Sequence, residues 1–366
     1  PILQTHDRFG GRIDEVEYHP AYHSMLNMAV EAGIHCMRYE QPAGDGAYVT
    51  RNALMGLITQ IEMGHGCPTS MTSAALVSLR HQPELAEVWE PLMVTRNYEH
   101  RLGPPGEKPG VLLGMGMTEK QGGSDVRANT STASPVNGGG PGGEYVLEGH
   151  KWFTSAPMCD AFLVLAYAPK GMSCFLVPRV LPDGTRNSLR FVRLKDKLGN
   201  RSNASAELEF DETAGWMVGE EGRGIPTIIE MVHATRLDVA NWGVSLMRQA
   251  VSQAAWHVAH RNAFGSTLID KPLMQNVLAD LEVEVEAATL MISRLSGAHE
   301  RMEIDDRERA FARLATPVAK YWLTKQSNPV VREALECVGG NGYVEDSIMP
   351  RLYREAPLNA IWEGSG

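Results

Sequence analysis

At 366 residues with 43% hydrophobic content, the chain is long enough for two or three domains and can form a large core. Its formal net charge of −10 argues against broad, non-specific binding of nucleic acid by these residues, though it does not exclude a local basic patch. No run of eighteen apolar residues occurs, so the sequence predicts no membrane span.

The cysteine pattern indicates a reducing compartment. Five cysteines are scattered along the chain without a CxxC pair or a Cys/His ligand spacing, which disfavours a disulfide framework and a structural zinc site. We therefore predict a cytoplasmic protein without a metal site. Because the chain begins at Pro1 and stops within a motif, we interpret it as part of a longer protein.

Residues 1 to about 110 are predicted to form an N-terminal helical domain. Apolar residues recur at three- and four-residue spacing in the segments 22–32, 47–63, 70–80 and 85–95. Pro68, Pro83 and the pair Pro104-Pro105 separate these segments, as helix boundaries often do.

Residues 111–218 have the composition of a β domain. Short β-rich segments at 111–115, 145–153, 161–168, 173–180, 189–194 and 206–210 are bounded by Gly, Pro, Asp or Asn. The glycine-rich stretch 137–143 is predicted to be a hairpin tip rather than a phosphate-binding loop, because no GK[ST] follows it.

Residues 219–366 return to helical periodicity. The segments 227–260, 273–302 and 307–325 are each long enough to cross a helical bundle. The order is helical, then β, then helical, without strand–helix alternation, and no GxGxxG occurs. This order disfavours a Rossmann fold and predicts an α+β protein with a small β-barrel between two helical regions.

Two segments stand out for their chemistry. Glu363 lies between Trp362 and Gly364, and a carboxylate in a dry, apolar slot gains the raised pKa of a general base. The alternative is a surface Glu at a helix end, since short motifs carry false positives. The loop 115–126 offers the hydroxyls of Thr118 and Ser124 and several backbone N–H groups to the edge of a planar heterocycle; its alternative is an ordinary polar turn.

Three further segments suit a cofactor. The strand segment 149–155 carries aromatic side chains next to hydroxyls. Arg261, in the turn Arg261-Asn262-Ala263-Phe264-Gly265, has the planar fork of donors that suits a diphosphate, or is a solvated Arg at a helix end. The glycines of 336–343 allow close backbone approach to a ligand and equally suit a helix C-cap and turn.

These five segments have the order and patterns of FAD-dependent acyl-CoA dehydrogenases, and the chain resembles that family over some 250 residues. The patterns are [TS]-E-x(2)-[AG]-G-S-D, G-x-K-x-[WYF]-x-[TS], R-x(2)-F-G, Q-x(2)-G-G-x-G-[YF] and R-[DE]-x(5)-I-[YW]-E-G-[ST]. Residues 115–126, 193–205 and 350–355, with Trp362, look closest to the branch that serves the bacterial adaptive response to DNA alkylation.

The resemblance implies an acyl-CoA dehydrogenase-like fold with three domains: an N-terminal helical domain (1–110), a middle β-barrel domain (111–218) and a C-terminal helical bundle (219–366). It also implies a homotetramer that binds FAD. Glu363 would be the base that removes an α-proton from an acyl thioester while a β-hydride passes to the flavin.

The resemblance also implies the binding residues. The FAD contacts would be Met115, Met117, Thr118, Gly123, Ser124, Phe153, Thr154, Ser155, Arg261, Phe264, Gly339, Gly340 and Ser365. The substrate contacts would be Ser124, Arg236, Trp362 and Gly364. Aligned on Lys151, Phe153 and Ser155 occupy the aromatic and hydroxyl positions; Trp152 and Thr154 would do so only if the strand slipped by one residue.

Several positions depart from the family pattern. Trp362 replaces a Tyr and would narrow the entrance for the acyl chain, and Ser365 replaces a Thr. Glu336 replaces the Gln of the glycine-rich element, and Pro272 stands where a Gln usually follows the R-x(2)-F-G turn. We therefore expect FAD to bind through a modified set of contacts. Some members carry their base on the long helix, but residues 234–236 here contain no Glu, so Glu363 keeps that role.

Three functions follow as hypotheses. The first is a dehydrogenase of acyl thioesters. The second is a flavoprotein that shields DNA, with weak or vestigial dehydrogenase activity and a basic DNA-binding extension beyond residue 366. The third is a helical bundle without a cofactor, which a flavin spectrum would exclude.

Overall fold

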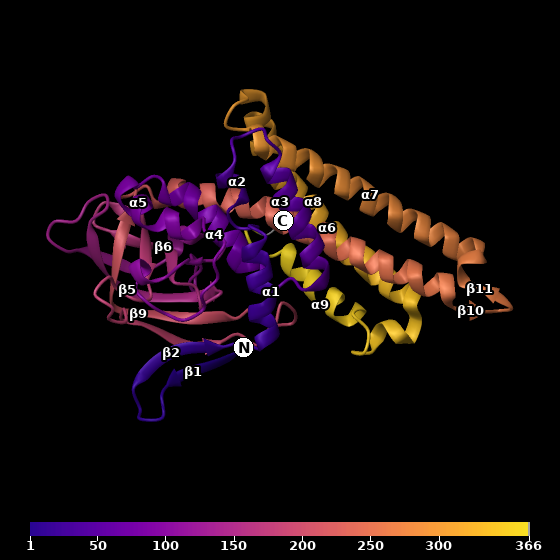
Figure 1. Ribbon diagram of the computed structural model, residues 1–366, viewed down its shortest axis with the longest axis horizontal. Helices are drawn as coiled ribbons and strands as arrows, with labels where there is room; N and C mark the ends of the chain where they lie inside the picture. Colours follow the sequence, from indigo (N-terminus) through magenta and orange to yellow (C-terminus); the bar gives the residue numbers. More distant parts are fainter. Residues whose placement is uncertain (365–366) are drawn as a thin grey trace. The chain divides into compact units, whose positions relative to one another are not determined.

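The computed structural model describes residues 1–364 and divides into two compact units (Figure 1). Unit 1 consists of Pro1–Glu40, Gly64–Lys197 and Arg201–Thr235. Unit 2 consists of Gln41–Met63, Leu198–Asn200 and the described residues from Arg236 onward.

The helices of unit 1 are those expected from the periodicity, apart from the short α2 (Met37–Glu40). They are α1 (Pro20–Glu31), α4 (Gly66–Leu79) and α5 (Pro83–Met93). Helix α4 is buried along nearly its whole length because its small side chains allow close approach on every side. The Thr72 hydroxyl of α4 accepts a 3.0 Å hydrogen bond from the Leu113 backbone N–H, which ties the helix to the β domain.

The first seventeen residues correct the expectation of a wholly helical N-terminal region. They form an antiparallel hairpin of β1 (Ile2–His6) and β2 (Arg12–Glu17). The Asp7 carboxylate accepts 2.8 Å hydrogen bonds from the backbone N–H groups of Phe9 and Gly11, and so closes the turn. Turn chemistry of this kind, and not apolar periodicity, specifies the hairpin.

Seven strands form the predicted barrel: β3 (Leu113–Gly116), β4 (Thr132–Pro135), β5 (Glu144–Ser155), β6 (Ala161–Ala168), β7 (Gly171–Pro178), β8 (Leu189–Leu194) and β9 (Ser205–Val218). The pairings β4–β5, β5–β9, β9–β7, β7–β6 and β6–β4 close a ring, while β3 pairs with β6 and β8 with β9. Closure leaves the five strands of this ring with a neighbour on each side. The short 3₁₀ turns η1 (Pro105–Glu107) and η2 (Val126–Ala128) lie in the connecting loops.

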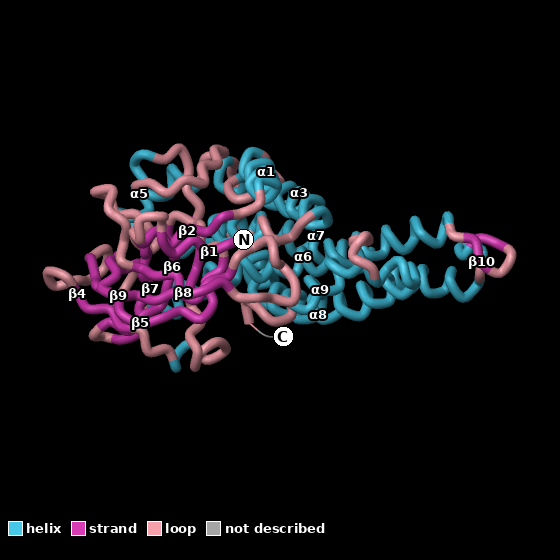
Figure 2. Tube along the Cα trace, turned by 90° about the horizontal axis from the view of Figure 1, so that it is seen from below, coloured by secondary structure: helices cyan, strands magenta, loops and turns pink. Residues whose placement is uncertain are grey.

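The long helices of unit 2 are those predicted from the sequence. Helix α6 (Gly224–His260) begins in unit 1, and α7 (Pro272–Arg301), α8 (Asp306–Val338), α3 (Ala47–Ile61) and α9 (Met349–Asn359) complete the bundle. Figure 2 shows α7 and α8 running alongside each other, away from the small hairpin of β10 (Asn262–Ala263) and β11 (Ser266–Thr267). The turns η3 (Leu268–Asp270) and η4 (Gly339–Tyr343) follow β11 and α8.

A buried ion pair fixes α3 against α6 within unit 2. Arg51 on α3 donates to both carboxylate oxygens of Asp238 on α6, at 2.5 and 2.8 Å, and the two side chains are 1% and 2% exposed. A paired, bidentate geometry of this kind offsets the cost of burying two charges.

The element order confirms the predicted succession of a helical region, a β-barrel and a helical bundle. No helix of residues 1–364 is long and apolar enough to cross a membrane.

Candidate functional site

In unit 1, the loop after β3 lies beside the end of β5. The backbone N–H of Trp152 donates a 2.8 Å hydrogen bond to the Thr118 carbonyl, and Thr118 forms a bridge with Phe153. The structure thus brings together two segments, 115–126 and 149–155, that the sequence analysis singled out separately. Met115, Met117 and Thr118 are partly exposed at this place, whereas Gly116 between them is buried.

The accessible side of β5 is set by a bulge. The register of β5 against β9 shifts between Lys151 and Thr154, so the strict alternation of faces is interrupted there. Phe153 is 46% exposed and Ser155 is half-buried, whereas Thr154 is fully buried. The Thr154 hydroxyl has no hydrogen-bond partner among residues 1–364 and lies near the space over Gly116. Phe153 and Ser155, the two residues that the alignment on Lys151 singles out, are therefore accessible, and Thr154 is not.

An ion pair inside the barrel anchors this loop, and sequence reasoning did not identify it. The Lys151 ammonium donates at 2.7 Å to the Glu119 carboxylate and at 2.7 Å to the Leu165 carbonyl. Both charged side chains are 0% exposed. Glu119 also accepts hydrogen bonds from the backbone N–H groups of Thr130, at 2.7 Å, and Ser131, at 3.2 Å. Burial raises the pKa of Glu119, but Lys151 and these donors outweigh it and hold the pKa down to about 2.

The tip of the loop is open to solvent. Gly123 and Ser124 are exposed, so their backbone and hydroxyl groups are accessible to a ligand. The buried ion pair of Glu119 therefore holds the start of the loop in place, while the tip of the loop at Gly123 and Ser124 stays accessible. Partly exposed methionines, a half-exposed Phe and nearby hydroxyls together suit one face and one polar edge of a planar ring.

In unit 2, the segment that carries Glu363 is held by two cations. Helix α9 ends at Asn359, and Glu363 and Gly364 then have positive φ angles of 58° and 96°. Arg236 Nε donates a 2.9 Å hydrogen bond to the Glu363 carbonyl, and Lys320 Nζ donates to the Gly364 carbonyl. A Cβ at Gly364 would lie 3.1 Å from Arg236 Nη2, so both the backbone angle and the close approach require glycine.

Trp362 packs beside the long helix in the same unit. Its ring centroid lies 5.4 Å from that of Trp242 on α6 at an interplanar angle of 51°. The Trp362 indole N–H is buried without a hydrogen-bond partner among the described residues. The predicted base Glu363 and three of the predicted substrate contacts, Arg236, Trp362 and Gly364, therefore lie together in unit 2, whereas the fourth, Ser124, belongs to unit 1. Ser365 lies outside the described residues.

The remaining cofactor residues are exposed in unit 2. Arg261 is exposed and forms no ion pair with any of residues 1–364. Phe264 is 92% exposed, at the tip of the β10–β11 hairpin, with a positive φ of 53°. Gly339 and Gly340 are exposed, and a Cβ at either would meet open space. These groups are thus accessible to a ligand or to another subunit.

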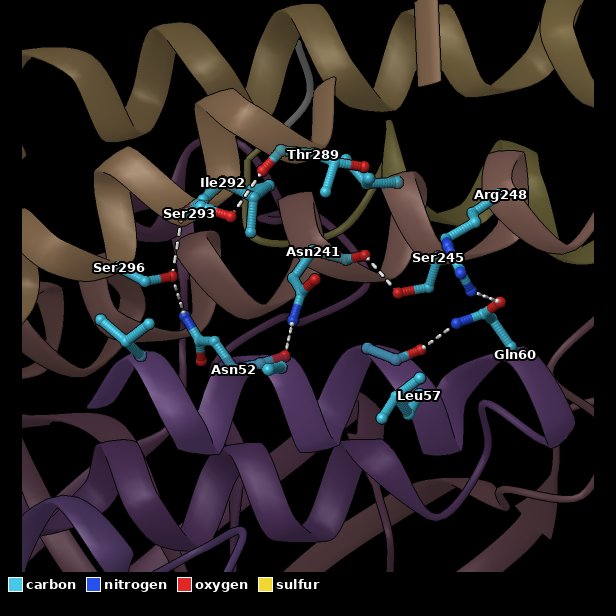
Figure 3. Close-up of a pocket in the computed structure, with 14 residues that line it drawn as sticks. Asn52, Leu57, Gln60, Asn241, Ser245, Arg248, Thr289, Ile292, Ser293 and Ser296 are labelled. Carbon is cyan, nitrogen blue, oxygen red and sulfur yellow. Dashed lines mark hydrogen bonds between the residues drawn. The ribbon is translucent and has the colours of Figure 1, made fainter. Parts of the chain in front are cut away.

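A cavity of about 270 Å³ lies between α3, α6 and α7 within unit 2 (Figure 3). Its polar lining is bonded internally: Asn241 donates at 2.8 Å to the Asn52 carbonyl, and Arg248 donates at 2.9 Å to the Gln60 side chain. Gly56 also lines the cavity, and a side chain at this position would crowd Asn241, because its Cβ would lie 3.3 Å from Asn241 Oδ1. Apolar lining residues such as Val244 leave space suited to an apolar group.

Another buried carboxyl group lies on α9. Glu355 is 3% exposed, and burial raises its pKa to about 7, a rise that Glu62 reinforces and that Arg351 and Arg354 oppose. Because the folded-state pKa is raised, the folded state holds its proton more tightly than the unfolded chain. Stability is therefore lost as the pH rises from about 4.5 through 7.

We expect Glu355→Gln to remove this pH dependence. The variant should be more stable than the wild type by about 2 kcal/mol at pH 8 and nearly equal to it at pH 4.5. Urea unfolding at the two pH values measures the difference. Glu333→Gln, at an exposed position of α8, is the matched control. A gain that is the same at both pH values would show that ionisation of Glu355 is not its cause.

Comparison with known proteins accounts for this arrangement. Residues 1–100 match the AidB N-terminal domain of the adaptive response, 114–213 the acyl-CoA dehydrogenase middle domain and 222–366 the acyl-CoA dehydrogenase C-terminal domain. AidB of Escherichia coli (strain K12) is 47% identical over 367 residues, which cover 100% of this chain and 67% of AidB. Acyl-CoA dehydrogenase family member 11 of Caenorhabditis elegans is 31% identical, over 100% of this chain and 60% of that protein.

Solved structures agree. Caenorhabditis elegans ACDH-11 in complex with C11-CoA superposes with a TM-score of 0.91 at 30% identity, covering 99% of this chain and 62% of that chain. The glutaryl-CoA dehydrogenase of Mycobacterium smegmatis in complex with FADH2 shares the fold, with a TM-score of 0.76 at 16% identity over 94% of this chain and 85% of that chain. The chain thus spans about 60 to 67% of the length of its curated relatives. It belongs to the acyl-CoA dehydrogenase family, within its AidB-like branch.

Proposed function

We propose that this chain is the FAD-binding dehydrogenase part of an AidB-like protein and that Glu363 is its catalytic base. The observation that carries the proposal is the strained turn at Glu363, whose two carbonyls are held by Arg236 and Lys320. Backbone strain persists only where the surroundings enforce it, and such positions concentrate at active sites. The segment is the one that matches the family's base motif.

In this proposal Glu363 removes the α-proton of an acyl thioester, and Trp362 and Arg236 border the substrate. The bound flavin supplies the acceptor, N5, for the β-hydride. A thioester ligand is supported by the C. elegans structure, which contains C11-CoA, at 30% identity to this chain. The large indole of Trp362 favours short or branched acyl groups, because overpacking a fitted site costs roughly 1–3 kcal/mol.

The residues for FAD fall into two groups. In unit 1, Met115, Met117, Thr118 and Phe153 offer the partly apolar, accessible surface that a flavin ring needs, with Gly123, Ser124 and Ser155 supplying polar contacts. The unpartnered buried hydroxyl of Thr154 supports a polar role close to that surface. In unit 2, Arg261 has no carboxylate partner among the described residues and suits a diphosphate, and Phe264, Gly339 and Gly340 are exposed beside solvent. Ser365 completes the proposed set.

We further propose three domains, 1–110, 111–218 and 219–366, and a homotetramer. The extents of the three family matches, 1–100, 114–213 and 222–366, support these boundaries. Apolar side chains left exposed along α8, Leu314, Val318 and Trp322 at 73, 61 and 52%, support burial against another subunit. We also propose a cytoplasmic location, which the free cysteines support, and DNA contact through an extension beyond residue 366, which the resemblance to AidB supports.

The purified protein is expected to be yellow and to release FAD on denaturation. An absorption spectrum between 300 and 550 nm and chromatography of the released flavin measure this. Addition of a short-chain acyl-CoA without oxygen should then bleach the flavin, which tests the dehydrogenase function. A colourless protein that is folded and oligomeric, yet does not take up added FAD, would overturn the proposal.

A further inference from the structure

A buried lysine lies next to the proposed base. Lys320, on α8, is 3% exposed, and its ammonium donates to the backbone carbonyl of Gly364. Lysine is almost never fully buried unless ion pairs or hydrogen bonds offset the cost of removing its charge from water. Lys320 lies four residues after Thr316 and four before Thr324, on the buried face of α8. This spacing indicates burial, and the sequence analysis did not use it.

Lys320 and Arg236 act on consecutive peptide groups. Arg236 Nε holds the carbonyl of Glu363 at 2.9 Å, and Lys320 holds the carbonyl of Gly364. Both residues of this turn have positive φ, a conformation that a non-glycine residue such as Glu363 adopts only when it is enforced. The direction of the Glu363 side chain therefore depends on two cations from two different helices, α6 and α8.

The same two cations set the charge around the carboxylate. Burial lowers the pKa of Lys320 to about 8, and the charges of Arg236 on α6 and Lys325 on α8 lower it too. The Glu363 carboxylate opposes them and raises the Lys320 pKa. This coupling is reciprocal, so a charged Lys320 must lower the pKa of the Glu363 carboxyl by the same interaction.

We propose that Lys320 is a positioning residue for Glu363: it fixes the turn through the Gly364 carbonyl and keeps the Glu363 carboxylate ionised and ready to accept a proton. The inference rests on the proposed function of Glu363. The positive charge of Lys320 favours the ionised form of Glu363. Because Lys320 itself loses this charge in mildly alkaline solution, its contribution depends on pH.

Two neutral variants separate the two roles. Lys320→Gln keeps a hydrogen-bond donor for the Gly364 carbonyl but removes the charge, whereas Lys320→Met removes both. The Glu363 carboxyl pKa, followed as the infrared carboxyl band that is absent from Glu363→Gln, should rise by about one unit or more in both variants. This measurement needs no turnover. Lys320→Arg keeps the charge and should retain the wild-type value.

The rate of anaerobic flavin reduction by butyryl-CoA gives the second readout. Below the carboxyl pKa, Lys320→Gln should be about tenfold slower than the wild type, the rate equivalent of one pKa unit. As the pH rises through about 8 the wild-type amine loses its charge and the carboxylate is ionised in both proteins, so the two rates should converge. A residue with a purely structural role would lower the rate by the same factor at every pH. Arg313→Met, which removes an exposed arginine from the same helix, should leave the profile nearly unchanged.

The outcomes distinguish the two proposals. If the flavin is reduced in a Glu363-dependent way but the Lys320 variants keep the wild-type carboxyl pKa and pH profile, the inference is wrong and the function stands. If no thioester reduces the flavin but the carboxyl pKa shifts as expected, the positioning role stands and the proposed function fails. If Lys320→Met alone misfolds, Lys320→Gln decides the question, because it keeps a polar donor at the buried position.

Discussion

Glu363→Gln is expected to slow thioester-driven reduction of the flavin by at least about 10²-fold, the lower end of the contribution of a general base. Glutamine keeps the size of the side chain and its hydrogen-bonding capacity, but it cannot accept the α-proton. The turn should survive, because Arg236 and Lys320 donate to the backbone carbonyls of Glu363 and Gly364, which the substitution leaves in place. Flavin content and oligomeric state should therefore match the wild type.

Stopped-flow absorbance under anaerobic conditions, with butyryl-CoA as reductant, measures this rate. Glu333→Gln makes the same chemical change at an exposed position of α8 and should reduce at the wild-type rate. Equal rates for Glu363→Gln and the wild type would place the base elsewhere. No reduction in either protein would favour the DNA-protecting alternative, in which the site is a remnant of the dehydrogenase scaffold.

The sequence predicted the elements whose signals are local and repeated. The 3.6-residue periodicity identified α1, α3, α4, α5, α6 and α7 to within a few residues, and the apolar run 161–168 coincides with β6. It underestimated α8, which continues from residue 325 to Val338 through Pro329. A proline inside a helix is usually read as its end, but the tertiary packing of α8 against α7 and α9 maintains the helix beyond it.

What the sequence could not predict depends on contacts between distant residues. Lys151 and Glu119 are 32 residues apart, and nothing in the motif that contains Glu119 indicates a carboxylate inside the barrel. Lys320 is 44 residues from Gly364, and it becomes visible only when its position is placed on the buried face of α8. Motif comparison identified accessible residues that suit a ligand. The charged residues that support them, Glu119, Lys151 and Lys320, could be identified only from the three-dimensional structure.

Breaking the buried ion pair of Glu119 and Lys151 is expected to cause a large loss of stability. Lys151→Met removes the counter-ion of a carboxylate that is 0% exposed. Removing one partner of a buried ion pair costs about 3–5 kcal/mol, because the other charge stays buried without compensation. Urea unfolding at pH 7 should show a loss of this size, and affinity for FAD should fall with it, since Glu119 precedes the exposed tip of the loop at Gly123 and Ser124.

Two further variants separate burial from the general effect of losing a charge. Arg190→Met breaks an ion pair with Asp211 in the same barrel, but these side chains are 47% and 46% exposed, so the loss should stay below about 1 kcal/mol. The double variant Glu119→Gln/Lys151→Met removes both charges and keeps one acceptor oxygen for the backbone N–H groups of Thr130 and Ser131, which bond to different oxygens of Glu119. It should recover much of the stability lost in Lys151→Met.

The pH dependence gives an independent check on the same pair. The folded-state pKa of Glu119 is lowered to about 2, so its contribution is present above pH 4.5 and is lost as the pH falls from 4.5 toward 2. The double variant has no carboxyl group at this position, and its stability should therefore decline less than that of the wild type over this range. If Lys151→Met costs no more than Arg190→Met, or if the double variant is as unstable as Lys151→Met, the pair does not anchor the loop in the way its geometry indicates.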